Sequence, residues 1–133
     1  MEYVDRSSHL LALITVGYTE SPNCIRELLR AVLTKKQITL MLDNSEGHGG
    51  MKWPEVEAGL AKALTCLSRW ELDVELQRWY KDGKTTCKTP TLEMIVDALQ
   101  PEQRLVYFRL KLFQDPVRCR RVAPAVVALC ATL

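Results

Sequence analysis

An uninterrupted apolar run near the start of the chain restricts its fold more than any other stretch. Residues 10–16, LLALITV, are apolar except for one threonine and do not alternate with polar residues. This pattern is typical of a strand that is buried on both faces, as in parallel sheets covered by crossover helices. We therefore expect an α/β fold in which this strand pairs with a later parallel strand.

A helix is predicted directly after this strand. Gly17 provides a flexible joint, Ser21 is a good N-cap, and Pro22 suits the first helical position, where its missing N–H costs nothing. Apolar residues then recur at positions 25, 28, 29, 32 and 33, which places them in one stripe of the helix. Residues 37–42 are predicted to form the next strand, so residues 10–42 make a strand, helix and strand unit.

The rest of the chain continues this alternation. We expect helices at residues 54–67, 70–80 and 91–99, a third strand at residues 104–110, and a last helix that begins at Pro116 and is kinked or divided at Pro124. Right-handed crossovers make such an alternation a parallel sheet. The predicted fold class is α/β: a partial, flavodoxin-like parallel sheet of about three strands flanked by helices.

Composition limits the functions open to the chain. Its 133 residues suit one domain, and its 47% hydrophobic and 26% charged residues are ordinary for a globular protein. The net charge of +2 is far from the basic excess of nucleic-acid binders. The N-terminus does not resemble a signal peptide, and no apolar run approaches the length of a membrane span. We expect no nucleic-acid partner, no membrane insertion and a cytoplasmic location.

The cysteines indicate neither a disulfide framework nor a metal site. There are five of them, an odd number, and they are widely spaced with no C-x-x-C pair. Only His9 and His48 could join them as metal ligands. This pattern fits reduced thiols. We therefore predict no metal site and no required cofactor.

The first strand and helix also carry the pattern of a known family. In Toll/interleukin receptor (TIR) domains, an apolar strand is followed by a Ser-x-x-Tyr-like turn and by Ser-x-Trp-Cys-x-x-Glu-Leu, which opens a helix. Five residues of this chain match that pattern in register: Tyr18, Ser21, Cys24, Glu27 and Leu28. The chain departs from it at Asn23, where the family commonly has Trp. The resemblance is strongest over residues 10–42.

The resemblance implies a catalytic residue. In TIR domains that cleave NAD, the glutamate of this motif is the catalytic carboxylate, which assigns the role to Glu27 and makes NAD a substrate. Glu27 would stabilise the oxocarbenium-like ribose as nicotinamide leaves, as carboxylates do in glycoside cleavage. Tyr18, Ser21 and Cys24 would line the same pocket. Helix geometry alone offers an alternative, a solvated Glu27 that pairs weakly with Arg30.

The resemblance also implies that part of the domain lies outside this chain. The strand at residues 10–16 resembles the third strand of a TIR domain, so residues 1–133 would be a single TIR-like domain that lacks its N-terminal third. The lacking part would include the loop that closes the nucleotide pocket. Ligands of such folds bind beyond the carboxyl ends of the strands, where residues 17–21 and 43–50 lie and near which we expect Glu27.

Three hypotheses for the function remain open. The first is a TIR-like signalling domain that associates with other TIR domains or with itself, and that derives from an NAD-cleaving ancestor. The absent pocket segment and Asn23 favour this version. The second is an active NAD glycohydrolase with Glu27 as its carboxylate. The third is an unrelated interaction domain of the response-regulator type, although no acidic cluster that could hold magnesium ends the first strand.

Overall fold

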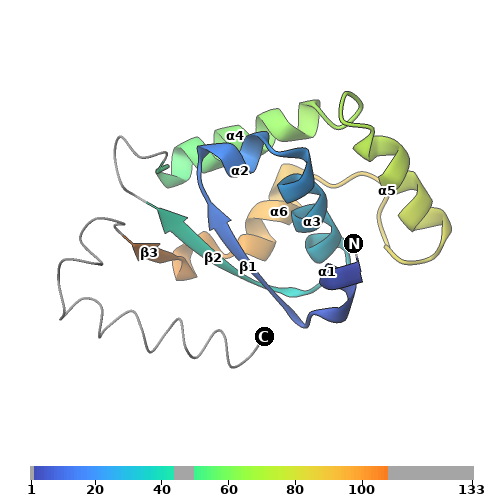
Figure 1. Cartoon of the computed structure of the whole chain (residues 1–133), viewed down its shortest axis with the longest axis horizontal. Coiled ribbons are helices and arrows are strands. Elements are labelled where there is room, and N and C mark those ends of the chain that lie inside the picture. The colour runs from blue at the N-terminus through green and yellow to red at the C-terminus, as the bar shows by residue number, and fades with distance from the viewer. Residues whose placement is uncertain (1, 44–49, 108–133) are drawn as a thin grey trace.

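A parallel sheet of three strands forms the centre of the structure (Figure 1). This computed structural model describes residues 2–43 and 50–107. The strands are β1 (His9–Ile14), β2 (Gln37–Asp43) and β3 (Leu105–Tyr107), and they lie in the order β1-β2-β3. Both pairings are parallel. The predicted fold class is confirmed, whereas residues 108–110 and the predicted last helix fall outside the described residues.

Helices connect and flank these strands. They are α1 (Glu2–Arg6), α2 (Val16–Glu20), α3 (Pro22–Leu33), α4 (Trp53–Thr65), α5 (Leu72–Lys81), α6 (Leu92–Leu99) and the 3₁₀ helix η1 (Pro101–Gln103). The sequence correctly predicted α3, α4, α5 and α6, but α2 forms where only a turn was expected. Among these helices, none is both long enough and apolar enough to cross a membrane.

Helix α3 forms as its sequence predicts. The Ser21 side-chain oxygen accepts a hydrogen bond from the Cys24 backbone N–H at 3.3 Å, and Pro22 occupies the first turn. The apolar stripe is buried against the sheet: Ile25, Leu28, Leu29, Val32 and Leu33. The cap and the stripe therefore fix both the start of α3 and the side that faces the core.

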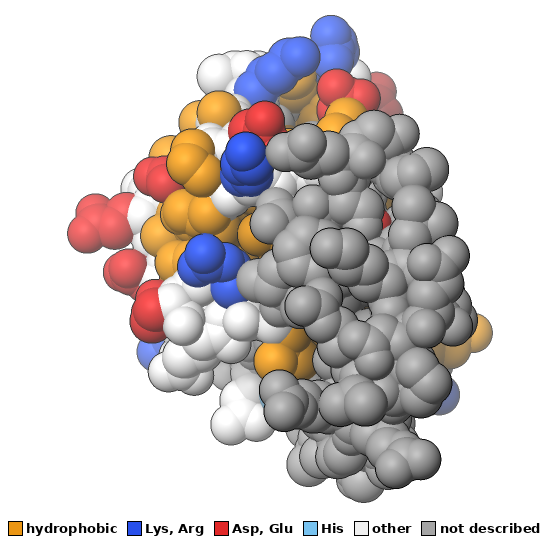
Figure 2. Space-filling model, turned by 90° about the vertical axis from the view of Figure 1, so that its left-hand side faces the viewer, with side chains coloured by type: hydrophobic (Ala, Val, Ile, Leu, Met, Phe, Trp, Pro, Cys, Tyr) orange, Lys and Arg blue, Asp and Glu red, His pale blue; other side chains and the backbone are white. Residues whose placement is uncertain are grey.

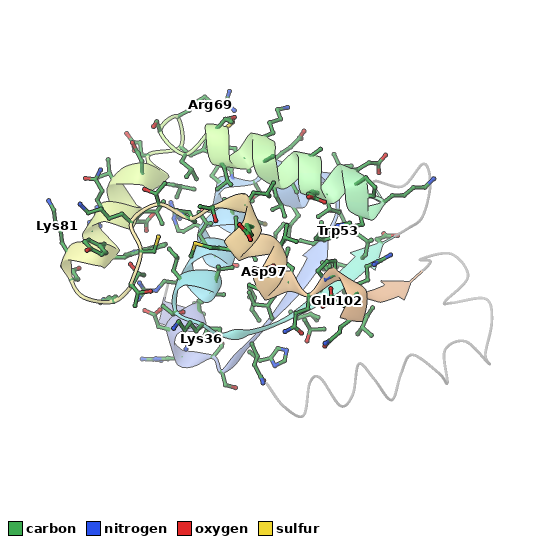
Figure 3. The ribbon with its side chains drawn as sticks, turned by 180° about the vertical axis from the view of Figure 1, so that it is seen from behind. Lys36, Trp53, Arg69, Lys81, Asp97 and Glu102 are labelled. Atoms are coloured by element: carbon green, nitrogen blue, oxygen red, sulfur yellow. The ribbon has the colours of Figure 1, made fainter. Side chains whose placement is uncertain are left out.

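The two faces of β1 are covered unequally. Ala12 and Ile14 on one face are 0% exposed, whereas Leu13 on the other face is 39% exposed. Helices α3 and α6 contact each other as well as the sheet, and Figure 3, seen from their side, shows α6 in front of the strands. The expectation of burial on both faces was therefore wrong for Leu13. Successive right-handed crossovers in one direction place their helices on the same face of the sheet.

A glycine allows α2 to pack closely on α4. An added Cβ at Gly59 would lie 2.9 Å from Oγ1 and 3.1 Å from Cβ of Thr19. Thr19 is buried, and its hydroxyl donates to the Val16 carbonyl at 3.2 Å, so it cannot move away easily. The contact between α2 and α4 therefore depends on the missing side chain at position 59.

Substitution of Gly59 should destabilise the fold through this contact. We expect Gly59→Ala to lower the free energy of unfolding by about 1–2 kcal/mol, because the added methyl group overpacks the helix interface. Urea denaturation of the variant measures the change. In a Thr19→Ala background, Gly59→Ala should lower the free energy of unfolding by less than it does in wild type, because the smaller side chain at position 19 leaves more room for the added methyl group. An equal loss in both backgrounds would contradict this explanation.

Candidate functional site

The four site residues predicted from the sequence lie together around the start of α3. Tyr18 belongs to α2, Ser21 caps α3, and Cys24 and Glu27 follow on its first two turns. Burial raises the pKa of the Tyr18 phenol above its usual value, and the nearby Cys24 and Glu27 groups raise it further. Tyr18 therefore keeps its proton at neutral pH, and its O–H remains a hydrogen-bond donor.

The Glu27 side chain is exposed to solvent. Within the described part of the chain it has no hydrogen-bond or ion-pair partner. It lines a hollow of about 140 Å³ together with Tyr3, His9, Leu10 and Lys36. His9 begins β1 and Lys36 precedes β2, so this hollow lies toward the amino ends of the strands rather than the carboxyl ends. Its volume is below the roughly 300–1,000 Å³ of small-molecule sites.

Arg30 does not pair with Glu27. It is 4% exposed, and its Nε and Nη2 donate to the two carboxylate oxygens of Asp5 at 2.7 and 3.1 Å. Its guanidinium lies 5.0 Å from the centre of the Trp79 ring. The expected pair was wrong because α1, through Asp5, and α5, through Trp79, cover the part of α3 that was predicted to face water.

The contact between Asp5 and Arg30 predicts a pH dependence of stability. The hydrogen bond from Arg30 lowers the pKa of the Asp5 carboxyl below its usual value of 3.8. Since the folded-state pKa is depressed, the stabilisation is complete above the unfolded-state value and is lost as pH falls through the folded-state value. The difference in unfolding free energy between wild type and Asp5→Asn should therefore be constant near neutral pH and shrink below about pH 4.

Urea denaturation at a series of pH values tests this dependence. Asp82→Asn serves as the control, because Asp82 is exposed and its side chain has no ion-pair partner among the described residues. If the difference in unfolding free energy between wild type and Asp5→Asn stayed the same down to low pH, the charge of the Asp5 carboxylate would not be what stabilises its contact with Arg30.

The sequence did not reveal a groove between α2 and α4. It has a volume of about 350 Å³, and Glu20, Lys62, Arg69 and Trp70 contribute to its lining. Glu20 could not be placed because α2 itself was not expected. The signal that could have found the groove is Gly59, whose missing side chain permits the close packing of α2 on α4.

A larger and more open cavity of about 640 Å³ lies at the amino ends of the strands. Lys35, Lys36 and Asp97 contribute to its lining, and its His9 ring nitrogen Nε2 lies 2.6 Å from Thr39 Oγ1. Figure 3 shows Asp97 on α6 and Lys36 near the start of β2, on separate elements. Charges of both signs therefore border this cavity, and they converge on no single point.

A buried carboxylate ends the central strand. Asp43 is 0% exposed at the carboxyl end of β2, where ligands of parallel α/β folds bind. Within residues 2–43 and 50–107, however, no group of three or more His, Cys, Asp or Glu residues is placed to hold a metal ion. The described cysteines Cys24, Cys66 and Cys87 are free thiols. Asp43 therefore does not by itself define a metal site.

Charge is mixed on the side of the molecule to which the strands point. Figure 2 shows Lys and Arg side chains interspersed with Asp and Glu around hydrophobic ones, without a field of one sign among the coloured atoms. This agrees with the small net charge of +2. The coloured atoms on this face therefore form no extended basic patch of the kind that binds nucleic-acid backbones.

Comparison with known proteins gives no relative. No family model matches the sequence, and neither a curated protein nor a solved structure matches it. The function has to be inferred from the fold and from the arrangement of the side chains described above.

Proposed function

We propose that the chain is a TIR-like interaction domain that associates with a second copy, and that this association uses the outer edge of β1. One observation carries the proposal. In the described parts of the chain, β1 pairs with β2 along one edge, and no strand pairs with its other edge. Such an edge presents unpaired backbone N–H and C=O groups that can accept another strand.

The sequence of β1 supports this role. Edge strands that avoid pairing commonly carry Lys, another charge, Pro or a bulge. Strand β1 reads HLLALI and contains neither proline nor a Lys, Arg, Asp or Glu residue. Exposed apolar side chains accompany it, since Leu13 is 39% and Val16 44% exposed. The strand therefore lacks the usual protections against pairing and offers apolar contacts to a partner.

A second copy of the chain suits this edge. Two identical strands that meet across a two-fold axis pair antiparallel, so every contact is made twice and the interface closes. Because β1 has no Lys, Arg, Asp or Glu residue, pairing with its own copy sets no like charges from these residues opposite each other.

Sedimentation velocity over a wide range of protein concentrations tests the proposal. We expect wild type to shift from monomer to dimer, and Leu13→Lys to weaken the dimer by about tenfold or more, because a lysine on an edge strand opposes pairing. Val74→Lys is the matched control, since Val74 is a 58% exposed residue of α5. A wild type that stays monomeric throughout, or equal weakening by both lysines, would refute the proposal.

A second candidate function is NAD cleavage with Glu27 as the carboxylate. The observation in its favour is that the Glu27 side chain is exposed, has no partner among the described residues, and is close enough to Tyr18 for its charge to raise the pKa of that phenol. The small hollow at Glu27 speaks against activity of the chain alone. Leu10 lines the same hollow, so a strand that paired with β1 would pass close to Glu27 and extend its walls.

Release of nicotinamide from NAD, followed by chromatography on concentrated protein, tests this candidate. Glu27→Ala should abolish the release, whereas Glu57→Ala, a change at an exposed glutamate of α4, should leave it intact. If wild type is folded and releases no nicotinamide at concentrations where it is dimeric, the enzymatic candidate is excluded for this chain. The first proposal then stands unaffected.

A further inference from the structure

The groove between α2 and α4 is separate from the edge of β1 and from Glu27. Its inner surface is apolar where Val16, Met51 and Ala63 line it, and Gly59 leaves room where α2 and α4 meet. Figure 3 shows Arg69 beyond the end of α4 that is opposite Trp53. With a volume of about 350 Å³, the groove is at the lower end of the range of small-molecule sites.

Three charged side chains and an indole border this apolar surface. Lys62 and Arg69 carry positive charge, Glu20 carries negative charge, and none of the three has an ion-pair partner in the described part of the chain. Arg69 Nη2 makes only a weak contact with the sulfur of Cys66, at 3.6 Å. Trp70 is half-buried, so part of its ring is accessible. Apolar pockets with a few convergent polar groups are the usual form of ligand sites.

We propose that this groove binds a small planar aromatic molecule that carries one anionic group. The ring stacks on Trp70 and covers the apolar surface at Met51. The anionic group lies between Lys62 and Arg69, whose guanidinium can hold a carboxylate or phosphate through two hydrogen bonds. Glu20 accepts a hydrogen bond from an N–H or O–H on the ring. The formal charge of these side chains sums to +1, which favours an anion.

Titration of ¹⁵N-labelled protein with matched probes tests the proposal. 2-Naphthoate has the ring and the charge, 2-naphthalenemethanol has the ring alone, and cyclohexanecarboxylate has the charge alone. We expect 2-naphthoate to shift the indole N–H signal of Trp70 in a saturable way, and the other two to bind about tenfold or more weakly. The buried Trp79, which packs against Arg30, is the internal reference and should not shift.

A second titration tests which anionic group the groove prefers. 2-Naphthyl phosphate compared with 2-naphthoate shows whether Lys62 and Arg69 prefer a phosphate or a carboxylate. Either preference is consistent with the proposal, provided that the charged probe binds more tightly than 2-naphthalenemethanol. Equal affinity for the alcohol would refute the assignment of the two cations, and the absence of any saturable shift of Trp70 would refute the site.

Substitutions of the groove residues show which side chains contribute to the affinity for 2-naphthoate. Lys62→Gln and Arg69→Gln should each weaken 2-naphthoate by about three- to tenfold, because each removes one charge contact. Arg78→Gln, at an exposed position of α5, should change nothing. Trp70→Leu should remove most of the affinity. Bound 2-naphthoate should also slow alkylation of Cys66, which lines the groove, relative to Cys87, which does not. Equal protection of both cysteines would contradict the location.

Discussion

Replacement of Ile14 by alanine is expected to lower the free energy of unfolding by about 2–5 kcal/mol. Ile14 is 0% exposed and ends β1 on the face that α3 and α6 cover. The substitution removes buried methyl groups and leaves a cavity that neighbouring side chains fill only in part. Urea denaturation measures the loss, and the slope of the transition should not change, because both states keep nearly the same exposed surface.

The adjacent residue provides the matched control. The Leu13 side chain points to the opposite face of the sheet from Ile14. Leu13 is 39% exposed, whereas Ile14 is 0% exposed. Leu13→Ala should cost less, about 1 kcal/mol, because 39% of Leu13 stays exposed after folding and its truncation leaves no enclosed cavity. Comparable losses at positions 13 and 14 would contradict the description of β1 as covered mainly on one face.

Replacement of Arg30 by alanine should have the second large effect, a loss of about 2–4 kcal/mol. The side chain is 5% exposed, holds both carboxylate oxygens of Asp5, and stacks over Trp79. Its removal abolishes two charge-assisted hydrogen bonds and the packing of its stem. The loss stays moderate because the Asp5 side chain is 38% exposed and regains water.

Arg26 on the same helix is the control for Arg30. Its Nε donates to Glu75 at 2.8 Å, and the two side chains are 35% and 20% exposed. Arg26→Ala should cost about 0.2–1 kcal/mol, the usual range for an accessible ion pair. Both losses can be measured by urea denaturation at neutral pH. Equal effects at positions 26 and 30 would show that burial does not set the strength of these contacts.

Local sequence signals were sufficient to predict most elements of the fold. The cap at Ser21 with Pro22 placed the start of α3 correctly. The helix predicted at residues 91–99 is α6, where the Thr91 side chain accepts a hydrogen bond from the Met94 N–H. The parallel sheet followed from the alternation of strands and helices. These features depend on backbone chemistry within a few residues, which the sequence displays directly.

Features that depend on contacts between distant elements were not predictable. The burial of Arg30 requires Asp5 from α1 and Trp79 from α5, and no local pattern places either of them there. The exposure of Leu13 depends on which face the helices cover. An apolar run shows that both faces of a strand tolerate burial, and it does not show which of them the structure covers.

The candidate sites also differ in whether they depend on local sequence or on contacts between distant elements. The sequence placed Tyr18, Cys24 and Glu27 close together because helical spacing and a short turn bring them there. It missed the groove of Glu20, Lys62, Arg69 and Trp70, since that groove exists only where α2 packs on α4. That no described strand pairs with the outer edge of β1 likewise became visible only once the order of the strands was known.

Hydrogen exchange of the β1 amides at low and high protein concentration tests the proposed self-association most directly. Peptides that cover His9–Ile14 should exchange about tenfold or more slowly at high concentration, because pairing with a second copy protects amides that no described strand pairs with in one copy. Peptides of β2, which is paired on both sides, should exchange at the same rate at both concentrations. Exchange of β1 that does not depend on concentration, or slowing confined to other elements, would contradict the proposal.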